Sequence, residues 1–135
     1  MPLTQNTPII LEVEVTPDGI LLLQLGGNLY SEEAGAQLSA WVEKAKSAIL
    51  ELKKRRSRIL CITDVSKLEN FDDGTFTLVK DFASWAGARD VRTAVLGASL
   101  VANMALRSLI LMSGRKNIKS FKNNVEALAW LKEGK

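Results

Sequence analysis

Histidine is missing from this sequence of 135 residues, and cysteine occurs once, as Cys61. The absence of histidine removes the commonest general base of enzymes and the commonest ligand of transition metals. It also excludes a Ser-His-Asp or Cys-His nucleophilic site, and a single cysteine excludes an intrachain disulfide and an ordinary structural zinc site. We therefore expect no enzyme activity, no metal and no cofactor. We expect Cys61 to pack as a small hydrophobic side chain in an apolar strand.

Long apolar runs and a strong charge of one sign are also missing. No apolar run approaches the roughly 20 residues that cross a bilayer, so no transmembrane helix is expected. The first residues, MPLTQNTP, lack the basic start and apolar stretch of a signal peptide. The net charge is +3, and the basic run at residues 53–58 has no interleaved aromatic side chain that would favour nucleic-acid binding. The sequence predicts a cytoplasmic protein without a nucleic-acid partner.

Strand and helix patterns alternate through the chain. Residues 9–15 alternate in polarity, a TPDG turn follows, and the apolar run 20–25 ends at two glycines, which together predict an antiparallel hairpin. Further strands are predicted at 58–63, 92–97 and 118–121, and helices at 31–55, 75–87, 99–114 and 123–134. Expected helix details include Ser31 as an N-cap and, in the last helix, inward-facing Val125, Leu128, Ala129 and Leu131.

This order predicts an α/β fold with a single domain at residues 9–134 after a short tail at residues 1–8. We expect a five-stranded, mostly parallel sheet with an N-terminal antiparallel hairpin and four helices. Right-handed crossovers between strands in monotonic order would put the connecting helices on one face. The continuously apolar central strands, however, indicate that both faces are covered.

The segment DVSKLENFDDGTF, residues 64–76, carries the most distinctive motif. It resembles the pattern D-[LV]-S-x-[VL]-x-x-[aliphatic]-D-S-S-G of the STAS domain, the fold of bacterial anti-sigma factor antagonists. Asp64, Val65, Ser66 and Leu68 match this pattern, and Asp72 lies eight residues after Asp64, as the pattern requires.

A closer resemblance is to the SpoIIAA-like branch of bacterial proteins, which is related in fold to the CRAL-TRIO lipid-binding domains. Three segments carry it in the expected order: LENFDDGTF, TAVLG and VEALAWLKEG. The resemblance covers nearly the whole chain. It implies a STAS-like binding module and no enzyme activity.

One position departs from the resemblance. The serine that is phosphorylated in anti-sigma factor antagonists corresponds to Asp73, and the second serine corresponds to Gly74. The usual phosphate acceptor is therefore missing, and Asp73 would either imitate the phosphorylated state or mark a chain without this switch. Thr75 and Ser66 are the remaining hydroxyl candidates.

Several interpretations of residues 64–76 stay open. Asp72 is a natural helix N-cap, Asp73 would lie in the positive first turn, and Gly74 would allow a close approach of backbone. The same turn also suits partner recognition, and a metal site or an enzyme are the remaining alternatives. The candidate interaction or switch loop consists of Asp64, Ser66, Asp72, Asp73, Gly74 and Thr75.

The predicted helix at 99–114 has an unusually wide apolar surface. Its polar residues up to Met112 are Ser99, Asn103, Arg107 and Ser108. Either other helices cover this surface, or it contacts a partner protein or a second copy, or it contacts lipid. The candidate apolar interface consists of Met104, Arg107, Ile110 and Leu111.

The first functional interpretation is a non-catalytic, regulatory module for protein–protein interaction, with a protein partner or itself as a homodimer. The alternative is binding of a small apolar ligand, a lipid or a membrane surface in the manner of CRAL-TRIO domains. A lipid binder should contain an apolar pocket lined by the helix at 99–114 and the helix that starts near Asp72. An interaction module should have a filled core and a flat patch.

Overall fold

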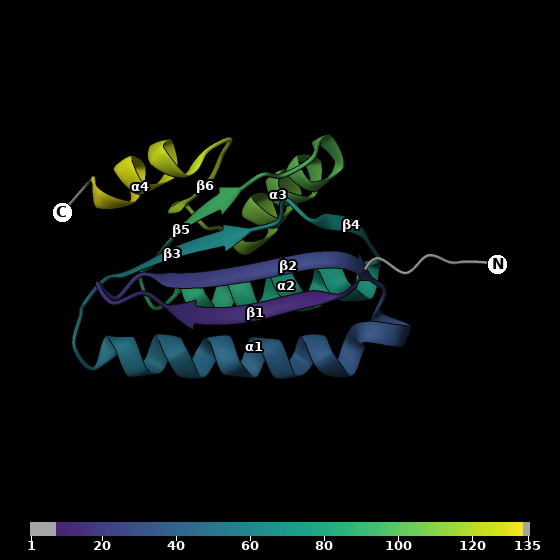
Figure 1. The fold of residues 1–135 in the computed structure, drawn as a ribbon, viewed down its shortest axis with the longest axis horizontal. Coiled ribbons are helices and arrows are strands. Elements are labelled where there is room, and N and C mark those ends of the chain that lie inside the picture. The colour runs from purple at the N-terminus through teal and green to yellow at the C-terminus, as the bar shows by residue number, and fades with distance from the viewer. Residues whose placement is uncertain (1–7, 134–135) are drawn as a thin grey trace.

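The computed structural model describes residues 8–133, so residues 1–7 of the expected tail, and residue 134 of the expected domain, lie outside the described part. Within residues 8–133 the chain forms six strands and four helices (Figure 1). Their bounds are β1 Ile10–Val15, β2 Leu21–Leu29, α1 Ser31–Lys53, β3 Ile59–Asp64, β4 Leu68–Phe71, α2 Asp73–Gly87, β5 Val91–Leu96, α3 Leu100–Ser113, β6 Ile118–Phe121 and α4 Asn124–Lys132.

The main sheet has the order β1-β2-β3-β5-β6. β1 and β2 pair antiparallel around the predicted turn, and the pairs β2–β3, β3–β5 and β5–β6 are parallel. This arrangement confirms the expected α/β fold with its N-terminal hairpin, mostly parallel sheet and four helices.

β4 is an additional strand that the sequence analysis did not predict. It pairs in parallel with the end of β2, beyond Gln24, the last β2 residue that pairs with β3. β2 is longer than expected because it continues through Gly26 and Gly27 instead of ending there. Gly27 has a φ of +84°, and a Cβ on it would lie 2.4 Å from the carbonyl oxygen of Pro8, so these glycines permit a bulge and a close approach.

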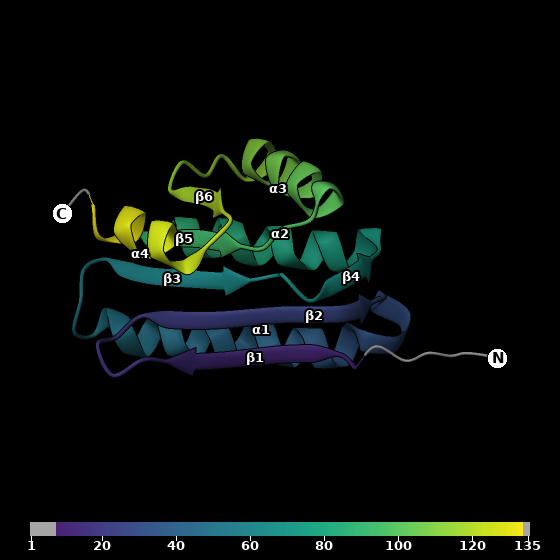
Figure 2. The same ribbon diagram turned by 45° about the horizontal axis from the view of Figure 1, so that its top comes forward.

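The two faces of the sheet are covered by different helices. α1, α2 and α3 cover one face, whose core includes Leu38, Phe82 and the partly buried Leu106, whereas α4 covers the other through Ala127 and Leu131 (Figures 1 and 2). α1, α2 and α3 are crossover connections between strands in monotonic order, so right-handed crossovers place them on one side. α4 follows the last strand, is free of this constraint, and packs on the opposite face.

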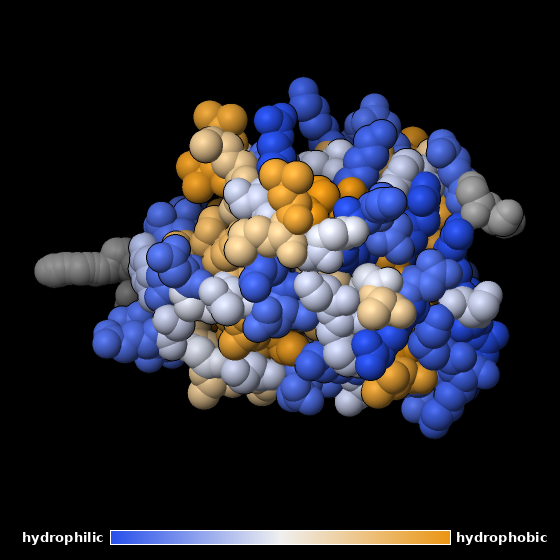
Figure 3. Space-filling model, turned by 180° about the vertical axis from the view of Figure 1, so that it is seen from behind, coloured by the Kyte–Doolittle hydropathy of each residue, from blue (hydrophilic) through white to orange (hydrophobic). Residues whose placement is uncertain are grey.

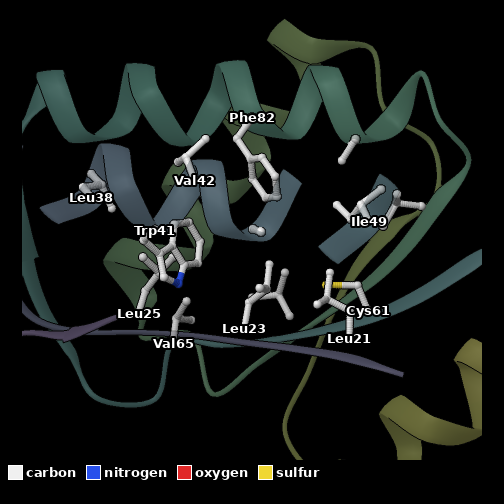
Figure 4. Packing of buried hydrophobic residues seen from close by; sticks show 14 of the residues in the cluster. Leu21, Leu23, Leu25, Leu38, Trp41, Val42, Ile49, Cys61, Val65 and Phe82 are labelled. Atoms are coloured by element: carbon white, nitrogen blue, oxygen red, sulfur yellow. The ribbon is translucent and has the colours of Figure 1, made fainter. Parts of the chain in front are cut away.

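The larger core lies between the sheet and the pair α1 and α2. Figure 4 shows Leu21, Leu23 and Leu25 pointing from β2 toward these helices, as the alternation of a strand requires. The rings of Trp41 on α1 and Phe82 on α2 lie edge to face at 5.9 Å, and the indole N–H of Trp41 donates to the carbonyl of Glu12 at 3.0 Å. The core therefore fixes both helices on the sheet.

Two helix details were wrong. Ser31 is the first residue of α1 and does not cap it; Tyr30 occupies the N-cap position without a side-chain hydrogen bond. In α4 the buried residues are Ala127 and Leu131, while Val125 is 78% exposed and Ala129 is also exposed. α4 has nine residues and packs on the sheet through Ala127 and Leu131, with Leu128 and Trp130 partly buried beside them, so Val125 and Ala129 remain on its outer side.

Candidate functional site

Asp72 joins the N-terminal ends of α1 and α2. Its Oδ1 accepts a hydrogen bond from the backbone N–H of Thr75 at 2.9 Å, which confirms the expected cap of α2. Its Oδ2 accepts from the backbone N–H of Ser31 at 2.9 Å and from the Ser31 hydroxyl at 2.8 Å. These bonds, first from Thr75 and then from Ser31, lower the pKa of Asp72 to about 2. One carboxylate therefore serves the first turns of two helices.

Gly74 and Thr75 complete this junction. A Cβ on Gly74 would lie 2.6 Å from the hydroxyl oxygen of Ser31, so glycine permits the close approach that was expected. Thr75 is 3% exposed, and its hydroxyl donates to the carbonyl of Leu29 at 2.7 Å. The Thr75 hydroxyl is thus used inside the fold and is not presented to a kinase.

The other candidates of this loop form a separate turn. Oδ1 of Asp64 accepts from the backbone N–H of Ser66 at 2.9 Å and from its hydroxyl at 2.7 Å. Ser66 and Asp73 are exposed, whereas Asp64 is half-buried. Of the six loop candidates, the structure joins Asp72, Gly74 and Thr75 in the helix junction and pairs Asp64 with Ser66.

An apolar cavity of about 130 Å³ lies between α2, α3 and the sheet. Its walls include Phe76 and Val79 of α2 and Ala102, Ala105 and Leu106 of α3. The two alanines leave space where α3 faces the sheet, and Leu109 is the buried side chain of this helix. The cavity is lined by the two helices that the sequence analysis named for an apolar-ligand binder.

Arg115 is the cationic side chain in the wall of this cavity, and it is 7% exposed. Its Nη2 donates to the carbonyl of Val91, to Thr93 Oγ1 at 3.3 Å, and to the carbonyl and side-chain oxygens of Asn117 at 3.3 and 2.9 Å. Nε donates to Asn117 Oδ1 at 3.1 Å, and Nη1 donates to the carbonyl of Ala83 at 3.4 Å. Arg115 was not among the predicted site residues, because no local sequence pattern distinguishes it from the other basic residues of the chain.

Cys61 also lies in the cavity wall, on β3. It is fully buried, and this burial raises the pKa of its thiol to about 11. The thiol is therefore protonated at neutral pH and unreactive. The prediction that Cys61 packs as a small hydrophobic side chain is confirmed.

The outward face of α3 is apolar and exposed. Leu111 is 83% exposed, and Figure 3 shows hydrophobic surface gathered where α3 lies, in the upper part of that view. Met104 and Arg107 are exposed as well, whereas Ile110 is half-buried. The remaining exposed apolar side chains of this helix are Leu100, Val101 and Met112. The α3 face therefore presents most, but not all, of the predicted interface.

Between residues 8 and 133, no three histidine, cysteine, aspartate or glutamate side chains come together in a way that could hold a metal ion. Within the same residues, none of the helices has the length and hydropathy needed to cross a membrane.

Comparisons with known proteins identify the fold. No family model matches the sequence, and no curated protein matches it. The structure is similar to that of an uncharacterised protein of the DUF3478 family with a SpoIIAA-like fold from Shewanella loihica PV-4. The TM-score is 0.65 and the identity 20%, over 96% of this chain and 99% of that chain. It is also similar to part of the structure of SLC26A9, with a TM-score of 0.57 and 13% identity over 83% of this chain and 19% of that chain.

These similarities confirm that the chain has a STAS/SpoIIAA-like fold, as its motifs predicted. At these identities the comparison speaks for the fold alone. A function must therefore be argued from the cavity, the helix junction and the surface of α3.

Proposed function

We propose that this protein is a STAS/SpoIIAA-like binding module that holds a small apolar ligand in the cavity between α2, α3 and the sheet. The observation that carries the proposal is the apolar cavity of about 130 Å³, lined by both helices named in advance for such a binder. A dry cavity of roughly 150 Å³ lined by Leu, Ile and Phe side chains binds benzene, so a ligand of that size class fits here.

The way α3 is held supports access to this cavity. Six side chains of α1 are buried, whereas α3 buries only Leu109 and packs mainly beside α2. Moving α3 outward would expose few buried side chains, since Leu109 is the one residue of this helix that is buried. α3 is therefore suited to act as the movable wall through which a ligand enters.

The proposal is tested by blocking the cavity. Benzene added to the wild-type protein should cause saturable NMR shifts of the methyl groups of Leu106 and Leu109. Ala105→Leu, which fills the space below α3, should abolish these shifts. Ala36→Leu is the matched control, because Ala36 is exposed on α1 and lies away from the cavity. Absence of saturable shifts in the wild-type protein, or full binding by Ala105→Leu, would overturn the proposal.

A second function is favoured by the outward face of α3. Its exposed apolar side chains are accompanied by Arg107 and by no acidic residue, and exposed Lys116 follows soon after the end of the helix. An apolar surface with basic neighbours complements an anionic lipid surface.

Vesicle binding tests this second function. The protein should sediment with vesicles that contain anionic lipid and less with purely zwitterionic vesicles, and Leu111→Ser should weaken the binding. Val125→Ser is the control, since Val125 is equally an exposed apolar side chain but belongs to α4. Equal binding by both variants would exclude α3 as the contact. The regulatory protein–protein interaction stays a prediction. It would be favoured if the wild-type protein bound no vesicles and Leu111→Ser lost binding to an isolated protein partner.

A further inference from the structure

Arg115 places a positive charge in the wall of an apolar cavity without an acidic residue to balance it. Among residues 8–133 no carboxylate lies within ion-pair distance of its guanidinium, and all its acceptors are neutral oxygens. We propose that the ligand of this cavity is a small apolar carboxylic acid whose carboxylate pairs with Arg115. This proposal rests on the proposed function, since it names the chemical class of the same ligand.

The geometry of the guanidinium leaves donor capacity on one side. Nε and Nη2 are held by Asn117, Val91 and Thr93, whereas Nη1 carries two N–H groups and has one long bond, at 3.4 Å, to the carbonyl of Ala83. Ala83 is itself part of the cavity wall. Nη1 is therefore the donor that a carboxylate in the cavity would reach.

Among the described residues, no charged group balances the buried charge of Arg115. Burial lowers the pKa of Arg115, but an arginine side chain stays protonated at neutral pH. Cys61 is the ionisable side chain that interacts with it electrostatically, and its thiol is neutral because its pKa is raised to about 11. A buried cation that is held only by neutral acceptors would be stabilised by an anionic partner.

The internal contacts of Arg115 explain how it is positioned without explaining its charge. Its side chain lies against Gly87, where a Cβ would come within 2.9 Å of Arg115 Cδ. It links the last turn of α2, through Ala83, to the start of β5, through Val91. The carbonyl end of α2 carries only a partial negative charge, which orients the guanidinium and does not neutralise it. Arg115 is thus held in place before a ligand arrives.

The cavity volume limits the apolar part of the ligand. A space of about 130 Å³ suits about six carbon atoms, by comparison with the cavity of roughly 150 Å³ that holds benzene. Hexanoate and benzoate combine this size with a carboxylate. Their neutral isosteres, hexanamide and benzamide, have the same shape and no charge.

The decisive experiment compares an acid with its amide. Hexanoate and hexanamide are titrated into the wild-type protein at pH 7, with calorimetry and NMR shifts as readouts. Hexanoate should bind at least about tenfold more tightly, because a hydrogen bond to a charged group is stronger than one between neutral groups. Equal or tighter binding of hexanamide would overturn the role of Arg115 and leave the apolar cavity as a binding site. Binding of neither compound, nor of benzene, would overturn the proposed function itself.

Variants locate the charge that the acid recognises. Arg115→Met should abolish the preference for hexanoate over hexanamide, and Arg115→Lys should retain part of it. Arg107→Met is the control, since Arg107 is exposed on the outer face of α3. This variant should prefer hexanoate over hexanamide as strongly as the wild-type protein does. A preference that survives in Arg115→Met would place the anion elsewhere. If Arg115→Met does not fold, the acid and amide comparison in the wild-type protein decides by itself.

Discussion

At the scale of single residues, Asp72 has the largest structural role in the motif that resembles the STAS pattern. Asp72→Ala removes the acceptor of three hydrogen bonds at the first turns of α1 and α2, and it should lower the thermal midpoint by several degrees. Asp73→Ala is the matched control, because Asp73 lies in the same turn and is exposed. Equal midpoints of the two variants in a thermal scan would contradict the shared cap.

The same residue predicts a dependence of stability on pH. The pKa of Asp72 is about 2 in the folded protein, below its usual value of 3.8. A lowered folded pKa means that the carboxylate stabilises the fold above about pH 4, and that this contribution is lost as the pH falls toward 2. The difference in midpoint between the wild-type protein and Asp72→Ala should therefore shrink over this window. A constant difference down to pH 2 would exclude the carboxylate as its source.

Local chemistry explains which residues could be predicted from the sequence. The cap by Asp72, the close approach at Gly74 and the packing of Cys61 follow from rules that act within a few residues. The bond from Thr75 to Leu29 joins residues 46 positions apart, and the hydrogen bonds of Arg115 reach α2 at Ala83 and β5 at Val91. Such contacts depend on tertiary packing, which no local pattern records.

At the scale of elements, α3 should be the most easily opened helix of the described chain. It buries only Leu109, whereas α1 buries six side chains, so the amides of α3 should exchange hydrogen faster than those of α1. Hexanoate should slow exchange in α3 and leave α1 unchanged. Exchange in α3 that is as slow as in α1 would show that this helix is not a movable wall.

Filling the cavity gives a second prediction for this element. Ala105→Leu should raise the free energy of unfolding by about 0.5–2 kcal/mol, because it adds apolar contacts where α3 leaves space. Urea unfolding measures this change, with Ala36→Leu as the exposed control. A lower stability of Ala105→Leu would mean that the cavity cannot accept the larger side chain.

The patterns in the sequence predict each helix of residues 8–133 and each strand except β4. β4 has four residues, Leu-Glu-Asn-Phe, with no continuous apolar run, and it forms because the end of β2 extends beyond β3. The wide apolar surface of α3 was also recognised. Which side of α3 is exposed and which side lines the cavity depends on where α2 packs. The periodicity of a single helix does not predict that position.

At the scale of the whole molecule, the fold depends on covering both faces of the sheet. Leu131 of α4 is 1% exposed and packs with Ala127 on the face opposite α1 and α2. Leu131→Ala should lower the free energy of unfolding by about 2–5 kcal/mol. Leu111→Ala, at an exposed position of α3, should change it by no more than about 0.5 kcal/mol. Similar losses in urea unfolding of both variants would contradict this assignment of the second core.

Coverage of both faces was expected from the apolar central strands, but the helix responsible was not. The monotonic strand order accounts for α1, α2 and α3 on one side, and the remaining helix must then serve the other. Strand order is set by contacts between distant segments, so it became known only with the structure.

The position of α4 at the end of the element order also bears on how the protein is made. A ribosome completes all strands of the sheet before it adds residues 124–132, so Ile20, Ile62 and Ala94 have no cover while the last helix is still being synthesised. During that interval the nascent chain carries an apolar sheet surface that can associate with other chains. Synthesis that pauses before α4 would therefore favour aggregation or recruitment of a chaperone. Once α4 leaves the ribosome and packs on this face, the apolar surface is covered.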